Sequence, residues 1–236
     1  MAKQVNNQNK KKLVPVAVIA AVLIIACIAA VVVNNRKDNG KSGQAGSQDR
    51  QEDARTSPSA GKENTKTDSG ITYYADIEIK DYGKITAGLY EDVAPITVKN
   101  FVSLAKEGFY DGLTFHRIME GFMMQGGDPE GTGMGGSGKT IIGEFANNGY
   151  DNKLSHTRGA LSMARSTNYN SASSQFFIVH QDSLFLDGDY AVFGYVTEGI
   201  EIVDKICENA QPIDGDGLIA SDAQPVITSI TIRDAE

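Results

Sequence analysis

A polar, low-complexity stretch between residues 34 and 70 limits what this chain can fold into. It is rich in Gly, Ser, Gln, Asn, Lys, Asp and Thr and almost lacks large apolar residues. Such a stretch buries too little surface to offset the entropy of ordering it, which predicts a flexible polar linker. Residues 71–236 must therefore supply the fold, and their number suits one domain with its own core.

The run from residue 13 to residue 33 consists of apolar residues and one early proline, without a charge. At about 1.5 Å per residue, a helix of this length has roughly the thickness of a bilayer core. Lysines in residues 1–12 outnumber the cations that directly follow the run. We therefore expect a transmembrane anchor, with residues 1–12 in the cytoplasm and residues 71–236 outside the cell membrane.

Two alternatives to a retained single-pass anchor stay open. A cleaved secretory signal fits less well, because its apolar region usually spans about 7–15 residues and no clean cleavage site follows. The segment from Ile24 to Cys27 resembles a loose lipobox, in which Cys27 would be lipidated, although more apolar residues follow it. All three interpretations place residues 71–236 on the same side of the membrane.

The charge of the chain is divided at the same boundary. Residues 1–70 carry an excess of Lys and Arg, whereas residues 71–236 are strongly acidic, and the whole chain has a net charge of −8. An acidic domain argues against nucleic acid or anionic lipid as a partner. Cys207 is the one cysteine after residue 70, so a disulfide within the domain is excluded and the fold relies on its core.

Two patterns that suggest ligands are better explained otherwise. His116, His156 and His180 lack metal-ligand spacing, so we expect surface or hydrogen-bonded histidines and no metal. Residues 133–140 satisfy the phosphate-loop pattern, but residues 141–145 after them are typical of a strand instead of the required helix. We predict a glycine-rich surface loop that flanks a pocket.

Hydrophobic periodicity predicts short strands and two helices. Alternation over 75–79 and 85–89, around a turn at 81–84, predicts a hairpin with one solvated face. Many short strands with few helices indicate an antiparallel barrel or sandwich. The remaining expected elements are a helix that starts at Pro95, buries Val98, Phe101, Val102 and Ala105 and ends near Gly108, a helix over 200–207, and a last strand with Val226, Thr228, Ile230 and Ile232 on one face.

The stretch from Phe115 to Asp128 carries the most chemistry. Arg117 precedes an apolar cluster that contains Phe122 and Met123, and Gln125 follows. A cation beside an apolar, aromatic surface can reach the nitrogen of a proline whose ring packs on that surface. We expect the segments Ser162–Arg165 and Ser174–Val179 to complete the pocket.

Six segments match one known pattern: Phe115–Ile118, Gly121–Met123 with Gln125–Asp128, Leu161–Ala164, Ser174–Ile178, Leu186–Gly188 and Val192–Gly194. In order and spacing they resemble the cyclophilin-type peptidyl-prolyl isomerases over nearly all of residues 71–236. The resemblance implies a mainly β fold, an eight-stranded antiparallel β-barrel capped by two α-helices, with the active groove on its outer surface. It also implies proline-containing polypeptides as substrates, no cofactor, and a monomer.

The resemblance also implies roles for individual residues. Arg117 is the implied catalytic arginine, assisted by Phe122 and Gln125. Phe122 also belongs to the implied proline pocket, and Gln125 to the groups that hold the substrate backbone. The other implied substrate-binding residues are Met123, Ala164, Arg165, Phe177, Phe185, Leu186 and Tyr190.

Three of these positions depart from the best-known members of the family. Phe185 stands where many have tryptophan, which implies weakened binding of cyclosporin-like inhibitors. Tyr190 stands where many have histidine, and keeps an aromatic ring with a polar tip. Arg165 stands where many have asparagine; it adds a cation beside the groove that would bias substrate choice, although a solvated loop residue is the simpler interpretation.

The expected function is isomerisation of X–Pro bonds in exported or surface proteins. Only the rotational barrier needs help, because the two isomers lie within about 1 kcal/mol. A guanidinium that bonds the pyramidal prolyl nitrogen of the twisted state would lower this barrier without a nucleophile or metal. The alternative is a non-catalytic proline-binding module or holdase chaperone on the same fold.

Overall fold

The computed structural model describes residues 70–235. Four predicted features lie outside the described residues: the cytoplasmic segment 1–12, the anchor 13–33, the lipobox at Cys27, and the linker 34–70 except for its last residue. Within residues 70–235, no helix is both long enough and apolar enough to cross a membrane.

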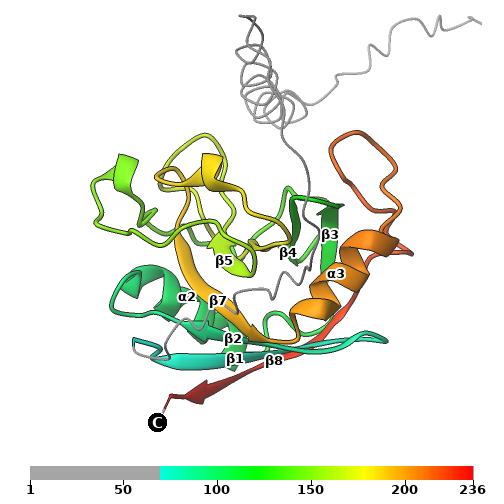
Figure 1. Cartoon of the computed structure of the whole chain (residues 1–236), viewed down its shortest axis with the longest axis horizontal. Coiled ribbons are helices and arrows are strands. Elements are labelled where there is room, and N and C mark those ends of the chain that lie inside the picture. Colours follow the sequence, from blue (N-terminus) through cyan, green and yellow to red (C-terminus); the bar gives the residue numbers. More distant parts are fainter. Residues whose placement is uncertain (1–69, 236) are drawn as a thin grey trace, which may run out of the picture. The chain divides into compact units, whose positions relative to one another are not determined.

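The fold is mainly β, with eight antiparallel strands in one sheet that curves into a half-barrel (Figure 1). The strand order is β3-β4-β6-β5-β7-β2-β1-β8. The two outer strands also approach each other, because Thr114 forms an isolated antiparallel bridge with Val226. The strands are β1 (Tyr73–Ile79), β2 (Gly83–Leu89), β3 (Thr114–Met119), β4 (Met123–Asp128), β5 (Ala160–Met163), β6 (Phe176–Val179), β7 (Val192–Glu198) and β8 (Ile227–Asp234).

The predicted first hairpin is confirmed. β1 and β2 pair with Ile77 opposite Ile85, and the alternating apolar residues of both strands are buried. The face predicted to be solvated is only partly exposed, because Thr86 on it is buried. Thr86 Oγ1 donates a hydrogen bond to the Asp76 carboxylate at 2.8 Å. The turn between the strands uses positive φ at Asp81 and Gly83.

Both predicted helices are also confirmed. The helix α2 (Pro95–Lys106) has Pro95 in its first turn, buries the four predicted apolar residues, and packs against β8. Gly108 follows its C-cap, Glu107, with φ of +70°, a conformation that glycine adopts without strain. The helix α3 (Ile200–Asn209) buries Val203, Ile206 and Cys207 and packs against β2 and β4. Two short 3₁₀ turns, η1 (Ala146–Asn148) and η2 (Leu184–Leu186), lie in connections.

An aromatic core joins α2 to the strands that carry the candidate site. The ring of Phe101 on α2 lies 5.3 Å from Phe176 on β6 and 5.2 Å from Phe193 on β7, centroid to centroid. Tyr110 packs edge-on against Phe176, and its hydroxyl donates to the Ser174 carbonyl at 3.1 Å. These contacts fix the inner face of β6, whose next residue, Phe177, points the other way.

The predicted face of the last strand is wrong at its beginning. Ile227 is fully buried, whereas Thr228 is exposed. The cause is a β-bulge: Glu78 pairs with Ser229 but Ile79 pairs with Ile227, which leaves one extra residue in β8. A bulge shifts the alternation by one residue, so simple alternation holds only from Ile230 onward.

Residues 133–140 form a loop, as predicted, and no α-helix directly follows them. The loop begins on Asp128, whose carboxylate accepts backbone N–H bonds from Glu130, Thr132 and Gly133 at 2.6–3.0 Å. After the loop, Ile141 makes an isolated bridge with Ala172. A phosphate-binding helix N-terminus is therefore absent from this part of the described chain.

Candidate active site

Arg117 lies on β3 directly opposite Gln125 on β4. Its Nε donates a 2.7 Å hydrogen bond to the carbonyl oxygen of Asp216, and one terminal nitrogen lies 3.4 Å from Gln125 Oε1. The guanidinium also lies over the ring of Phe122, 5.8 Å from its centroid. The strand pairing thus brings together the cation, the amide and the aromatic ring that the sequence assigned to catalysis.

The terminal nitrogens of Arg117 otherwise face sulfur. One lies 3.3 Å from Met119 Sδ and the other 3.8 Å from Met123 Sδ, and thioether sulfur is a weak acceptor. Burial lowers the pKa of Arg117, an effect that the nearby Asp216 and Asp214 carboxylates oppose. An arginine stays protonated at neutral pH, so the site holds a half-buried cation with weakly bonded terminal nitrogens.

The apolar residues assigned to the proline pocket form one cluster. Met123, Phe177 and Leu186 are almost fully buried, with 1%, 5% and 4% of their surfaces exposed. The other four buried members are Ala160, Val179, Val192 and Tyr195, and Phe122, Ala164 and Tyr190 are among the partly buried residues that pack against them. The structure thus brings together residues from β4, β5, β6, β7 and η2 that are far apart in the sequence.

A chain of amides borders the cluster. Gln125 Nε2 donates to Gln175 Oε1 at 2.8 Å, and Gln175 Nε2 donates to the Gly135 carbonyl at 2.8 Å. The backbone N–H of Ala164 donates to the Gln175 carbonyl at 3.0 Å. Gln175 therefore links the two residues expected to hold the substrate backbone, and it joins them to the glycine-rich loop.

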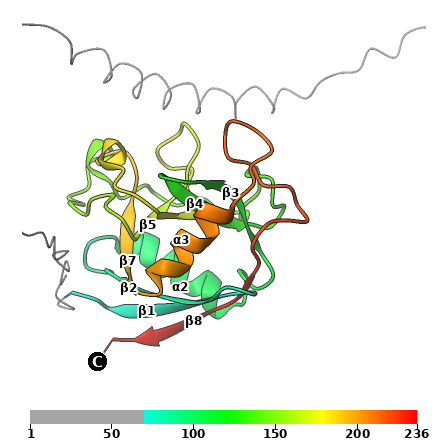
Figure 2. The same ribbon diagram turned by 45° about the vertical axis from the view of Figure 1, so that its right-hand side comes forward.

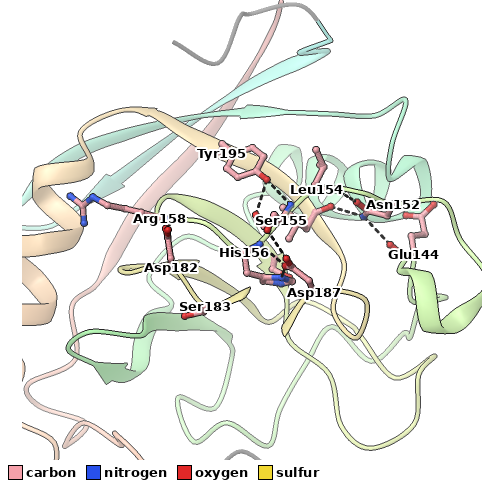
Figure 3. Close-up of polar contacts among 12 residues, drawn as sticks. Glu144, Asn152, Leu154, Ser155, His156, Arg158, Asp182, Ser183, Asp187 and Tyr195 are labelled. Carbon is pink, nitrogen blue, oxygen red and sulfur yellow. Dashed lines mark hydrogen bonds and ion pairs between the residues drawn. The ribbon is translucent and has the colours of Figure 1, made fainter. Parts of the chain in front are cut away.

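Behind the cluster lies a buried histidine that a carboxylate holds in place. Asp187 Oδ1 accepts the backbone N–H of His156 at 2.7 Å and lies 2.8 Å from its Nδ1 (Figure 3). His156 Nε2 lies 3.0 Å from Ser162 Oγ. The imidazole stacks on Phe177, with centroids 5.9 Å apart and planes 15° apart. Asp187 directly follows Leu186, so this network supports two walls of the cluster.

The segment that carries His156 has no regular secondary structure, and side chains hold it in place. Ser155 donates from Oγ to the second Asp187 oxygen at 2.5 Å, and its backbone exchanges two hydrogen bonds with the Tyr195 hydroxyl. Asn152 donates to the carbonyls of Glu144 and Val192 at 2.9 and 2.8 Å (Figure 3). Burial lowers the pKa of His156 despite the opposing pull of Asp187.

Arg165 is not the freely solvated residue that was the simpler expectation. It is half-buried, and its Nε donates to the Asp189 carbonyl at 2.8 Å. Its guanidinium lies 4.5 Å from the ring centroid of Tyr190, with Tyr169 and Phe145 at 4.9 and 5.1 Å. Aromatic faces attract such a cation, so Arg165 holds Tyr190 against the cluster.

Phe185 lies at the outer edge of the same region. Its side chain is 45% exposed, and its ring lies 5.6 Å from that of Phe122. All ten residues predicted from the sequence therefore gather around Arg117 and the cluster.

The histidine expectation holds for only two of the three. His156 is hydrogen-bonded, and His180 accepts the Gly121 N–H at 2.9 Å, but both are buried. His116 is buried, and neither ring nitrogen has a hydrogen-bond partner among the described residues. Nowhere in residues 70–235 do three His, Cys, Asp or Glu side chains gather as a metal site would require.

Two contacts of the site were missed in the sequence. Met119 contacts the guanidinium, and alternation along β3 could have indicated it, since it lies two residues after Arg117 on the same face. The second contact is the hydrogen bond that the Asp216 backbone carbonyl accepts from Arg117 Nε. Every residue has such a carbonyl, so the residue type does not indicate this contact. The only local signal is the Asp-Gly-Asp-Gly run at 214–217, which predicts a tight turn.

Comparisons with known proteins agree with this geometry. The sequence profile described as cyclophilin type peptidyl-prolyl cis-trans isomerase/CLD matches residues 74–236. Peptidyl-prolyl cis-trans isomerase B of Bacillus subtilis is 51% identical over 123 residues, which are 52% of this chain and 82% of that protein. A peptidyl-prolyl cis-trans isomerase of Helicobacter pylori strain 26695 is 48% identical over 137 residues, 57% of this chain and 80% of the relative.

A solved structure has the same fold. The cyclophilin type peptidyl-prolyl cis-trans isomerase of Cryptosporidium parvum, crystallised in the presence of the dipeptide Ala-Pro, superposes with a TM-score of 0.60. It is 32% identical, and the match covers 69% of this chain and 99% of that one. The chain therefore belongs to the cyclophilin-type peptidyl-prolyl cis-trans isomerases and is an enzyme that acts on proline-containing peptides.

Proposed function

We propose that Arg117 accelerates the rotation of X–Pro bonds by bonding the prolyl nitrogen in the twisted state. The observation that carries the proposal is the unequal bonding of its guanidinium. Nε is fixed by the Asp216 carbonyl at 2.7 Å, whereas the terminal nitrogens face weak sulfur acceptors and a 3.4 Å amide contact. A substrate can therefore recruit the terminal N–H groups without breaking a strong hydrogen bond.

The reaction needs no more than this differential bond. The planar peptide bond resists rotation with a barrier of roughly 18–20 kcal/mol because of resonance. At the twisted geometry resonance is lost and the prolyl nitrogen gains a basic lone pair, which a guanidinium bonds more strongly than it bonds the planar amide. A half-buried cation makes such a bond stronger than it would be in water.

The apolar cluster supplies the fixed side of the rotating bond. We assign the proline ring to the surface made by Phe122, Met123, Phe177 and Leu186, which lies next to the Arg117 guanidinium. Gln125 and Ala164, joined through Gln175, would hold the flanking peptide. Holding one side in place converts binding energy into orientation, which lowers the entropic part of the barrier.

The decisive experiment compares the full-length protein with its Arg117→Ala variant on one X–Pro peptide. By analogy with deletion of one oxyanion-hole donor, we expect kcat/KM to fall on the order of 10²–10³-fold. Peptide affinity should change far less, because the proposed bond forms fully only in the twisted state. Arg117→Lys should restore only part, because an ammonium keeps the charge and loses the planar fork.

Thermal melting is the control, since Arg117 is only half-buried. A folded Arg117→Ala variant that keeps most of its activity would contradict the catalytic role.

We also propose a place for the enzyme: a single-pass anchor at residues 13–33 that tethers the domain on the outer side of the cell membrane. The apolar run, the lysines before it and the polar segment after it support this proposal. The substrates would then be exported or surface proteins, whose slow X–Pro isomerisation limits folding. Lipidation at Cys27 would place the domain on the same side. We further propose that the domain acts as a monomer.

A further inference from the structure

The carbonyl that holds Arg117 belongs to a short hairpin after α3, the orange segment in Figure 2. Ile213 N–H donates to the Leu218 carbonyl at 2.8 Å, so residues 214–217 form the turn of this hairpin. Leu218 in turn makes an antiparallel bridge with Arg117 itself. The hairpin therefore extends the sheet beyond β3 at the position of the proposed catalytic residue.

The turn is closed by the side chain of Asp214. Its Oδ1 accepts the N–H of Asp216 at 3.0 Å and that of Leu218 at 2.9 Å. The Asp216 carbonyl lies between these two N–H groups along the chain. Fixing both groups on one oxygen therefore fixes the direction of the carbonyl, as side-chain-to-backbone bonds of Asp and Asn do in turns.

Gly217 lets the turn come close to β3. Its φ is +89°, and a Cβ there would lie 2.5 Å from Met119 Cγ and 2.9 Å from the Ile118 carbonyl oxygen. Any other residue would have to displace the turn or Met119. The close approach allows the Asp216 carbonyl to reach Arg117 Nε at 2.7 Å.

We propose that Asp214 is a positioning residue for isomerisation: its side-chain acceptor sets the 214–217 turn, and the Asp216 carbonyl then fixes the guanidinium plane of Arg117. The proposal rests on the catalytic role of Arg117 given above. An arginine side chain has many rotamers, and a bond at Nε restricts the plane in which its terminal N–H groups lie. A misplacement of about 1 Å can cost as much as 10²-fold in rate.

A competing explanation is that the Asp214 charge acts on the Arg117 cation directly. Substitution separates the two explanations. Asp214→Ala removes both the acceptor and the charge, whereas Asp214→Asn keeps Oδ1 and removes only the charge. Asp222 is an exposed carboxylate farther along the same segment and has no contact with the site, so Asp222→Ala is the matched control.

The experiment measures kcat and KM of the full-length variants on one X–Pro peptide. We expect Asp214→Ala to lower kcat about 10-fold with KM changed less than about 2-fold, and Asp214→Asn to keep at least about half of the kcat. Gly217→Ala, which displaces the carbonyl by another route, should also lower kcat. The proposal is overturned if Asp214→Asn is as slow as Asp214→Ala, or if Asp214→Ala keeps the wild-type kcat.

A double-mutant cycle shows whether the effect passes through Arg117. In an Arg117→Ala background, Asp214→Ala should have no further effect on the residual rate. An equal fold-loss in both backgrounds would overturn the proposal. If Arg117→Ala is slow and Asp214→Ala is not, this proposal alone fails. If Arg117→Ala stays fully active, the proposed function fails and this proposal with it.

Discussion

Phe185 lacks the indole N–H donor of the tryptophan that stands at this position in many family members. Its exposed ring packs against Phe122 at the edge of the site, so a larger indole has room to point outward. If the indole of the family donates to cyclosporin, we expect Phe185→Trp to bind that inhibitor about 2–10-fold more tightly, the value of one neutral hydrogen bond. Titrating the wild-type protein and the Phe185→Trp variant with cyclosporin measures the two affinities. Peptide turnover should stay nearly constant, and equal inhibitor affinities would remove the explanation.

We expect His116 to make the domain sensitive to mild acid. Its imidazole is buried next to Arg117 without a hydrogen-bond partner in the described structure, and burial lowers its pKa to about 4. An unfolded histidine has a pKa of about 6.5, so the unfolded state binds the proton first. The stability that depends on neutral His116 is complete above pH 6.5 and is lost as the pH falls toward 4. The expected loss is about 3 kcal/mol.

Urea unfolding between pH 7 and pH 4 measures this loss, and His116→Leu is the comparison. Leucine fills a similar volume and does not titrate, so the variant should lose clearly less stability over this range. His156, whose pKa burial also lowers, contributes to the acid dependence of both proteins alike. Parallel stability curves for the two proteins would show that His116 does not cause the acid sensitivity.

At the scale of elements, the side chain of Asp187 holds part of the connection between residues 150 and 158. The carboxylate accepts three hydrogen bonds or close contacts from Ser155 and His156. We expect Asp187→Asn to cost about 1–3 kcal/mol in unfolding free energy, because one partner would face a donor instead of an acceptor. The KM for an X–Pro peptide should also rise, since His156 stacks on Phe177.

Asp151→Asn is the matched control for this prediction. Asp151 lies in the same connection, but its 3.2 Å ion pair with Lys153 is solvent-exposed on both sides. Exposed pairs contribute little, so its unfolding free energy should change by less than about 0.5 kcal/mol. An Asp187→Asn variant as stable and as active as this control would show that the network does not support the site.

Elements governed by local pattern could be predicted from the sequence, whereas those set by distant pairing could not. The first hairpin and both helices follow from alternation, Pro95 and the spacing of apolar residues. The bulge in β8 arises from its pairing with β1, which lies far away in the sequence. The roles of the ten site residues could be predicted because the resemblance to a known family also implies its fold. The contact of the Asp216 carbonyl with Arg117 and the burial of His116 could not, because they arise only when the strands pair.

For the whole molecule, the described residues carry a core of their own. Its buried residues run from Ala75 on β1 to Ile230 on β8, and the family profile matches only residues 74–236. We expect a protein made of residues 70–236 to melt within a few degrees of the full chain and to keep kcat/KM within about 2-fold. Calorimetry and a peptide assay on both would check this. A fragment that aggregates or is inactive would show that residues 1–69 contribute to folding.

The proposed position outside the membrane makes a prediction about intact cells. The lysines before residue 13 should keep residues 1–12 in the cytoplasm. Protease added outside should then cut between residues 34 and 70 and release a soluble fragment, because a polar, low-complexity sequence is a better protease target than a packed core. The fragment is detected with an antibody against the domain. Release only after permeabilisation would contradict the topology.

The same cells separate a retained anchor from a lipoprotein. A lipoprotein would carry its lipid on the Cys27 sulfur, which is the one sulfur in the apolar run. In that case Cys27→Ser would abolish labelling by a fatty-acid probe and prevent cleavage before residue 27. If residues 13–33 stay as an anchor, the variant should remain full-length in the membrane. One serine in so long an apolar run removes only a small part of the free energy of membrane insertion. We expect the second result. If the wild-type protein takes up the probe and the Cys27→Ser variant does not, the protein is a lipoprotein and the retained anchor is wrong.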